Sequence, residues 1–182
     1  NIWTESKKWC NIRKERGFVM FGFLTFGTTL TLLDLALKKQ VEAQEDKNFP
    51  RELKGSQGLI WLYKNHNPGF SFGFLKGSRA VELVPLCFAS GIAGAWTYLM
   101  GLRGRFMEKL ALTLTLAGGI SNVYDRMTRG YVVDYFSIRW KGLKKVVLNL
   151  GDLFIFTGAV LVAALGFLKS VKDWRDSSSE GM

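Results

Sequence analysis

The chain has 182 residues, of which 48% are hydrophobic, and a formal net charge of +10. This length suits one unit over residues 1–182, and the apolar content indicates an integral membrane protein. The charge favours attraction to anionic membrane lipids, and the absence of a basic stripe interleaved with aromatics argues against a nucleic-acid partner. Because the sequence has one histidine, His66, interpreted as a loop residue, and no metal-binding motif, zinc and serine–histidine hydrolysis are excluded and no cofactor or metal is expected.

Four apolar stretches are long enough to cross the hydrocarbon core of a bilayer, which is roughly 30 Å thick and takes ~20 residues. They run over residues 17–37, 84–102, 106–124 and 151–168. An even number of spans puts both termini on one side of the membrane. Lys and Arg are densest in the short segments on that side, so the positive-inside rule predicts cytoplasmic termini. The longer loops, 38–81 and 125–150, are then extracytoplasmic.

The first span ends in a charged stretch. Asp34 and Lys38 lie four residues apart on one helical face, so we expect a partly buried ion pair or an interhelical hydrogen bond. Residues 40–48 then either extend the first helix or form a separate surface helix.

Strand-forming residues follow in the first long loop. Residues 59–63 predict a strand that ends at the turn signal Asn-His-Asn-Pro-Gly of residues 65–69. Beyond it, Phe70, Phe72 and Phe74 alternate with small residues. This alternation predicts a short strand in a sheet roofing an active site, an aromatic belt at headgroup depth, or both.

Small residues near the end of the third span predict a close helix contact. Gly118 and Gly119 let a neighbouring helix approach where lipid supplies no hydrophobic drive, and packing alone explains them. Asn122 can hydrogen-bond across that contact, and we expect it near a site. Asp125 and Arg126 follow, and each is expected to pair with another group as structural support.

After the third span, residues 131–138 alternate like a strand. In that register Val132, Asp134 and Phe136 share one face. The basic run at 139–145 is interpreted as a solvated loop that touches lipid phosphates.

Asp134 and Asp152 each lie at the edge of a long apolar segment, where a carboxylate costs up to ~2.5–3.5 kcal/mol and indicates function. Asp152 falls in the first turn of the fourth helix, whose dipole favours the ionised form, and its charge would make a nearby Asp134 hold its proton. Such a pair can activate water and polarise a carbonyl, so it predicts an aspartyl hydrolase whose two carboxyls titrate as a unit. The alternative is a helix-terminal Asp152 and a surface Asp134 without chemistry.

Five motifs in this order resemble those of the bacterial lipoprotein signal peptidases, which are aspartyl proteases. The resemblance covers residues 33–168 and rests on Asp-x-x-x-Lys at 34–38, Asn-Pro-Gly-Phe-Ser-Phe at 67–72, Gly-Gly-Ile-Ser-Asn-Val-Tyr-Asp-Arg at 118–126, Gly-Tyr-Val-Val-Asp-Tyr at 130–135 and Leu-Asn-Leu-Gly-Asp at 148–152. It implies a mainly α membrane protein of the bacterial cytoplasmic membrane, taken as a monomer, with four transmembrane helices, a small extracytoplasmic β-cradle and a lid helix.

The resemblance also implies a reaction. Asp134 and Asp152 would cleave diacylglyceryl-modified prolipoproteins just before the lipidated cysteine, with the substrate's lipid chains entering between helices. Supporting roles in substrate binding or positioning are implied for Asp34, Lys38, Asn67, Gly69, Gly118, Asn122, Arg126, Val132, Asn149 and Gly151.

Three departures from the family pattern bear on substrate range. Ser121 replaces a glycine, Gly151 replaces an alanine, and Phe70 with Ser71 replaces paired alanines. A substrate-altered relative, or one that binds lipoproteins without cutting them, is one alternative, although retention of both aspartates argues against a pure binder. A small transporter or proton-conducting subunit is another, since buried carboxylates also carry ions.

Overall fold

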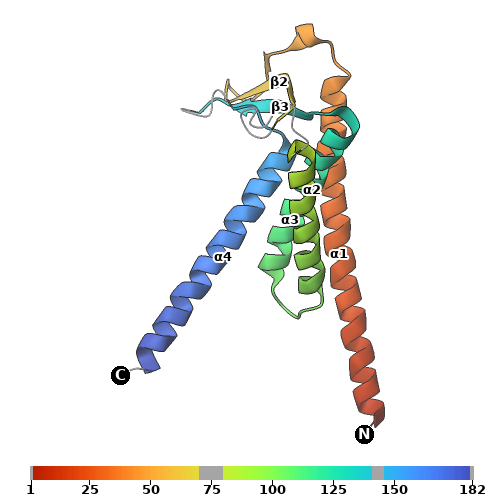
Figure 1. Ribbon diagram of the computed structural model, residues 1–182, viewed down its shortest axis with the longest axis vertical. Coiled ribbons are helices and arrows are strands. Elements are labelled where there is room, and N and C mark those ends of the chain that lie inside the picture. Colours follow the sequence, from red (N-terminus) through yellow and green to blue (C-terminus); the bar gives the residue numbers. More distant parts are fainter. Residues whose placement is uncertain (1, 70–79, 141–145, 181–182) are drawn as a thin grey trace.

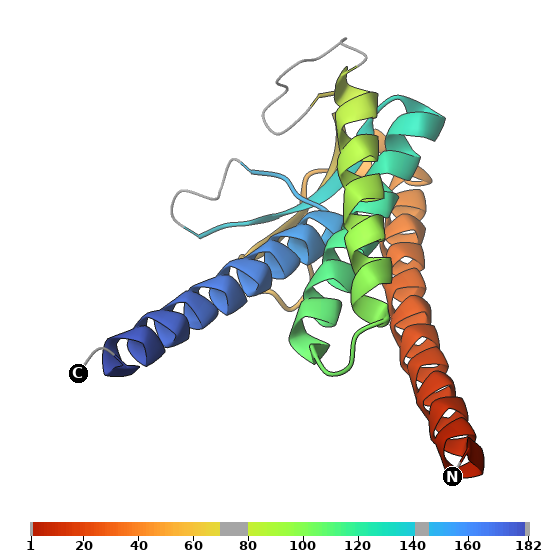
Figure 2. The ribbon, with the colours of Figure 1, turned by 60° about the horizontal axis from the view of Figure 1, so that its bottom comes forward.

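The computed structural model describes residues 2–69, 80–140 and 146–180. Four long helices dominate it: α1 (Ile2–Glu42), α2 (Ala80–Met100), α3 (Phe106–Arg129) and α4 (Leu150–Glu180). A small sheet lies at one end of the helices, while the N-terminal end of α1 and the C-terminal end of α4 both lie at the other end (Figure 1). From the sheet, α1 and α4 diverge in both views (Figures 1 and 2).

The helix α3 differs from the others in composition. Within the described residues, three segments are long and apolar enough to cross a membrane: Arg16–Glu42, Leu83–Met100 and Leu150–Ser178. The predicted span 106–124 does form a helix, but α3 is less apolar because it buries a stripe of polar side chains: Lys109, Thr113, Ser121, Asn122 and Asp125. Since α3 packs against all three other helices, these groups meet protein rather than lipid.

Glycines let α3 and α4 cross at short range. A Cβ atom on Gly118 would overlap the backbone carbonyl of Gly151, and one on Gly158 would overlap Thr115 of α3. Close backbone approach at small residues is a common way for helices to associate in membranes. The predicted packing role of Gly118 is therefore confirmed, and its partner is the first turn of α4. The same prediction is wrong for Gly119, where a Cβ atom would meet nothing within 4 Å.

The sheet contains three antiparallel strands in the order β1 (Arg51–Glu52), β2 (Ile60–Asn67) and β3 (Val132–Ile138). The predicted strand at 59–63 is confirmed, but it continues to Asn67, because residues 65–67 pair with β3 beyond a register shift instead of forming a turn. His66 consequently lies on a strand and not in a loop. The predicted strand at 131–138 corresponds to β3.

The sheet packs on the end of α1 through Val41, Val133, Tyr135 and Phe136, which form its buried core. An isolated antiparallel bridge pairs Phe136 of β3 with Leu148, which lies two residues before the start of α4. The charged stretch at 40–48 divides: α1 continues to Glu42, and a single 3₁₀ turn, η1 (Asp46–Asn48), follows. The alternating phenylalanines at 70–74 with Ser71, and the part of the basic run at 141–145, lie outside the described residues.

Candidate active site

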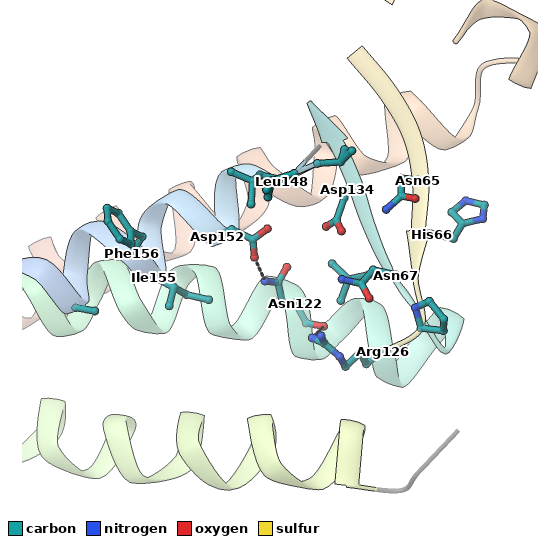
Figure 3. A pocket seen from close by; sticks show the side chains of 15 residues that line it. Asn65, His66, Asn67, Asn122, Arg126, Asp134, Leu148, Asp152, Ile155 and Phe156 are labelled. Carbon is teal, nitrogen blue, oxygen red and sulfur yellow. Dashed lines mark hydrogen bonds between the residues drawn. The ribbon is translucent and has the colours of Figure 1, made fainter. Parts of the chain in front are cut away.

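A cavity of about 790 Å³ lies where the sheet meets α3 and α4. Six of the residues singled out from the sequence line it: Asn67, Asn122, Arg126, Val132, Asp134 and Asp152. One end is polar, with Asn65, His66 and Arg126, and the other is apolar, with Ile155 and Phe156 on α4. Figure 3 shows the carboxylates of Asp134 and Asp152 between these two ends.

One buried residue, Asn149, joins the two aspartates through its side chain and its backbone. Its Nδ2 donates a hydrogen bond to Oδ1 of Asp134 at 2.8 Å, and its backbone N–H donates to Oδ2 of Asp152 at 3.1 Å. Asp134 is brought in by β3, and Asp152 by the first turn of α4. The structure therefore brings to one cavity two carboxylates that lie eighteen residues apart in the sequence, with a single asparagine between them.

The position of Asp152 follows from local helix chemistry. The backbone N–H of Asp152 donates to Oδ1 of Asn149 at 2.9 Å, while the carboxylate of Asp152 accepts the N–H of Asn149. This reciprocal pair is a capping box at the N-terminus of α4. An asparagine three residues before an acid at the start of an apolar helix is the sequence signal for it.

Asn122 connects Asp152 to α1. Its Nδ2 donates to Oδ1 of Asp152 at 2.9 Å, and its Oδ1 accepts from Nζ of Lys38 at 2.8 Å. Because an ammonium group can only donate, Lys38 requires the oxygen of the amide and leaves its N–H₂ for Asp152. The expected placement of Asn122 near a site agrees with these contacts.

Lys38 lies at the centre of a fully buried charge cluster. Its Nζ is 2.9 Å from Oδ2 of Asp34 and 3.3 Å from Oδ2 of Asp125, and all three side chains have no solvent exposure. Asp125 also accepts bonds from Arg129 and from the backbone N–H of Val133 on β3. The predicted Asp34–Lys38 pair is thus confirmed and more deeply buried than expected, and the predicted pairing of Asp125 is confirmed as well.

Arg126 and Asn67 organise the polar end of the cavity. The guanidinium group of Arg126 donates to the carbonyl oxygens of Gly69 and Asn122 at 3.1 and 3.3 Å. Asn67 accepts the N–H of Gly69 at 3.2 Å and also hydrogen-bonds Asp134. These bonds tie the end of β2 to α3 beside the aspartates.

The environment of Asp134 favours its protonated form. Burial raises the pKa of this carboxyl to about 6, and the negative charge of Asp152 adds to the rise, while the hydrogen bonds from Asn149 and Asn67 oppose it. The sequence-based reasoning expected this direction from the neighbouring charge alone. The larger cause is removal from water, which disfavours the ionised carboxylate.

Two hydroxyl groups contact the buried cluster without any signal in the sequence. The side chains of Ser121 and Tyr135 each donate a hydrogen bond to Asp34. From the sequence, Ser121 stands out only as a departure from a family pattern and Tyr135 only as a member of a motif, and neither position predicts a contact. Their partner lies 87 and 101 residues away in the chain, so no local pattern could have identified it.

Comparisons with known proteins agree on one family. A family model described as signal peptidase (SPase) II matches residues 27–168. The lipoprotein signal peptidase of Moorella thermoacetica is 36% identical over 142 residues, which cover 77% of this chain and 89% of the relative. That of Allorhizobium ampelinum is 32% identical over 136 residues, which cover 75% and 82%.

A solved structure described as a bacterial membrane enzyme has the same fold, with a TM-score of 0.70 at 19% identity over 84% of this chain and 90% of that chain. The predicted fold class is confirmed by this structure. The predicted signal peptidase activity is confirmed by the family model and the relatives. The chain belongs to the signal peptidase II family.

Proposed function

We propose that Asp134 and Asp152 are the catalytic pair of this signal peptidase, cleaving diacylglyceryl-modified prolipoproteins just before the lipidated cysteine. The observation that carries the proposal is that both carboxylates line one cavity and accept hydrogen bonds from the same buried residue, Asn149. Each carboxylate has a different environment, since Asp152 accepts the side-chain amide of Asn122 and the backbone N–H of Asn149 at the start of α4, whereas Asp134 is buried on a strand. Different environments are what divide two carboxyls into a base and an acid.

In the proposed reaction, ionised Asp152 removes a proton from a water molecule as its oxygen attacks the scissile carbonyl carbon. Protonated Asp134 donates its proton to the carbonyl oxygen, which would otherwise carry the developing negative charge. Collapse of the tetrahedral intermediate reforms the carbonyl, returns a proton to Asp134 and breaks the C–N bond. The proton taken up by Asp152 passes to the leaving amine, so both carboxyls end in their starting states.

The two ends of the cavity support the proposed substrate. Ile155, Phe156 and Ala159 line its apolar end along α4, where the acyl chains of a lipid-modified cysteine would avoid water. Asn65 and Arg126 line its polar end, where amide and guanidinium groups can hold a peptide backbone. We assign Asn67, Asn122, Asn149 and Arg126 to positioning of the aspartates and the peptide.

The arrangement in the membrane is part of the proposal. The chain would form one unit in the bacterial cytoplasmic membrane. In this unit α3 would cross the bilayer packed against the other three helices. The N-terminal end of α1 and the C-terminal end of α4 lie remote from the sheet, which supports cytoplasmic termini and an extracytoplasmic site (Figure 1). We also propose that the protein is a monomer that contacts membrane lipids.

The catalytic pair is tested with purified protein in detergent and a diacylglyceryl-modified precursor. Signal-peptide release is measured by mass spectrometry for Asp134→Asn, Asp152→Asn and Asp173→Asn, the last being an exposed carboxylate on the same helix as Asp152. We expect the first two variants to lose cleavage and the third to retain it. A thermal unfolding transition in each variant should show that all three are folded. Cleavage retained in either site variant refutes the assignment, and wild-type protein that binds the precursor without cutting it indicates a binding relative.

A further inference from the structure

Asp34 has a hydrogen bond on each carboxylate oxygen from a different element. Its Oδ1 accepts from the hydroxyl of Tyr135 on β3 at 2.9 Å, and its Oδ2 accepts from the hydroxyl of Ser121 on α3 at 2.6 Å. Lys38 of α1 lies 2.9 Å from the same Oδ2. Because the carboxylate has no solvent exposure, protein groups replace the water that would otherwise solvate it.

The hydroxyl of Tyr135 links three elements. It donates to Asp34 of α1, and it accepts the backbone N–H of Leu150, the first residue of α4, at 3.1 Å. Burial and the charge of Asp34 raise the pKa of Tyr135, so the hydroxyl keeps the proton that it donates. Tyr135 is the neighbour of Asp134 in sequence, and Leu150 precedes Asp152 by two residues. One hydroxyl therefore ties the strand of the first aspartate to the helix end of the second.

Ser121 acts on the same assembly from α3. Its hydroxyl donates to Asp34 and accepts from Nζ of Lys38 at 3.0 Å. Lys38 in turn fixes the amide of Asn122, which donates to Asp152. Ser121 is thus two hydrogen bonds from the amide that holds Asp152.

We propose that Ser121 and Tyr135 are positioning residues that clamp Asp34 and thereby set the relative placement of Asp134 and Asp152. We name this arrangement the hydroxyl clamp: the Ser121 and Tyr135 hydroxyls with the Asp34 carboxylate. It rests on the proposed function, since it concerns the alignment of the same carboxyl pair.

The hydroxyl clamp also explains the glycine at 151. A Cβ atom there would lie 2.9 Å from Oδ2 of Asp34 and 2.9 Å from Oδ1 of Asn149. Both oxygens are held by hydrogen bonds, to Ser121 and Lys38 in the first case and to the N–H of Asp152 in the second. A methyl group at 151 therefore competes with the Ser121 hydroxyl for the placement of Asp34. Glycine at 151 and serine at 121 form a coupled pair.

The clamp is tested first by deleting each hydroxyl. Tyr135→Phe and Ser121→Ala are compared with Tyr98→Phe and Ser90→Ala, which remove exposed hydroxyls from α2. Since a misplacement of about 1 Å can cost ~100-fold in rate, we expect kcat to fall by ~10–100-fold in the clamp variants, with KM within about twofold of wild type. A purely structural role would lower thermal stability without changing kcat of the folded enzyme, and that result overturns the proposal.

The coupling is tested by a double-mutant cycle. Gly151→Ala in the wild-type background should lower kcat by ~10–100-fold, and Ser121→Gly should lower kcat less in that background than it does alone, because the new methyl group has already displaced the carboxylate of Asp34. Gly151→Ala that is fully active, or a Ser121→Gly effect of equal size in both backgrounds, refutes the clamp. If wild-type protein cleaves no precursor, the proposed function fails; if it cleaves and the clamp variants keep kcat, the clamp alone fails.

Discussion

At the sheet end of the helices, side chains from α1, α3 and β3 meet in a buried polar cluster around Asp34 and Lys38, and the backbone N–H of Leu150 joins it from α4. At the opposite end, α1 and α4 diverge and expose Phe18, Phe167 and Trp174 (Figure 1). Lipid tails are as apolar as these aromatic side chains, so bringing them together would gain little. Polar groups have no such substitute in lipid, because an unsatisfied one costs several kcal/mol there. Polar contacts therefore hold the site end together, whereas the apolar side chains mainly suit the protein to its bilayer.

The largest effect is expected where the polar cluster loses its cation. Lys38→Met leaves the carboxylates of Asp34 and Asp125 buried without their shared ammonium group. Breaking a buried pair by removing one partner typically costs ~3–5 kcal/mol, so we expect a loss of that size in the free energy of unfolding in detergent. Lys169→Met, on the exposed end of α4, is the matched control and should leave stability unchanged. Equal stability of the two variants would contradict the inference that the buried polar cluster holds the site end together.

A smaller effect is expected at the α3–α4 crossing. Gly118→Ala forces a methyl group into the backbone of Gly151, whereas Gly119→Ala, one residue further along α3, meets nothing within 4 Å. Overpacking typically costs ~1–3 kcal/mol, so Gly118→Ala should lower the unfolding free energy by about that much and also reduce cleavage by shifting Asp152. Gly119→Ala should affect neither measurement. If both variants behave alike, the close crossing is not what holds α4 in place.

The smallest effect concerns pH and the aspartate pair. The pKa of Asp134 is raised from its ordinary 3.8 to about 6, so the folded state binds this proton more tightly than the unfolded state does. The resulting stabilisation is complete below about pH 3.8 and is lost as pH rises through about 6. We expect the unfolding midpoint of wild type to fall over that window.

The corresponding slope should be absent in Asp134→Asn. Asp46→Asn is the control. The hydrogen bond and charge of Lys64 lower the pKa of Asp46, so this carboxylate contributes stability that is lost as pH falls, which is the opposite direction to Asp134. A pH slope that survives in Asp134→Asn would show that another group causes it.

Much of the site was predictable because its signals are local. Asn149 and Asp152 are separated by three residues and carry the pattern of a helix N-terminus, which is what they form. Asp34 and Lys38 follow helical spacing and do pair. The alternation at 131–138 indicated a strand, and β3 covers most of it.

Other predictions were wrong in detail where neighbours decide the outcome. The turn signal at 65–69 predicted the end of a strand, yet β2 continues to Asn67 because Asn65, His66 and Asn67 find partners on β3. His66 then reaches Glu42 of α1 at 2.7 Å and stacks on Tyr131. Pairing with a strand about 70 residues further along the chain outweighed the local turn propensity.

The four long helices, the strands β2 and β3 and the two aspartates at apolar boundaries are predictable from the amino-acid sequence, because hydropathy, periodicity and capping act between residues a few positions apart. The two-residue strand β1 carries no such signal. Which groups satisfy the buried charges, and which side of α3 faces the other helices, depends on the packing of the elements. The bonds from Ser121 and Tyr135 to Asp34 exist because three elements converge there. A buried polar group must take the partners that packing supplies, and packing joins residues that are far apart in the chain.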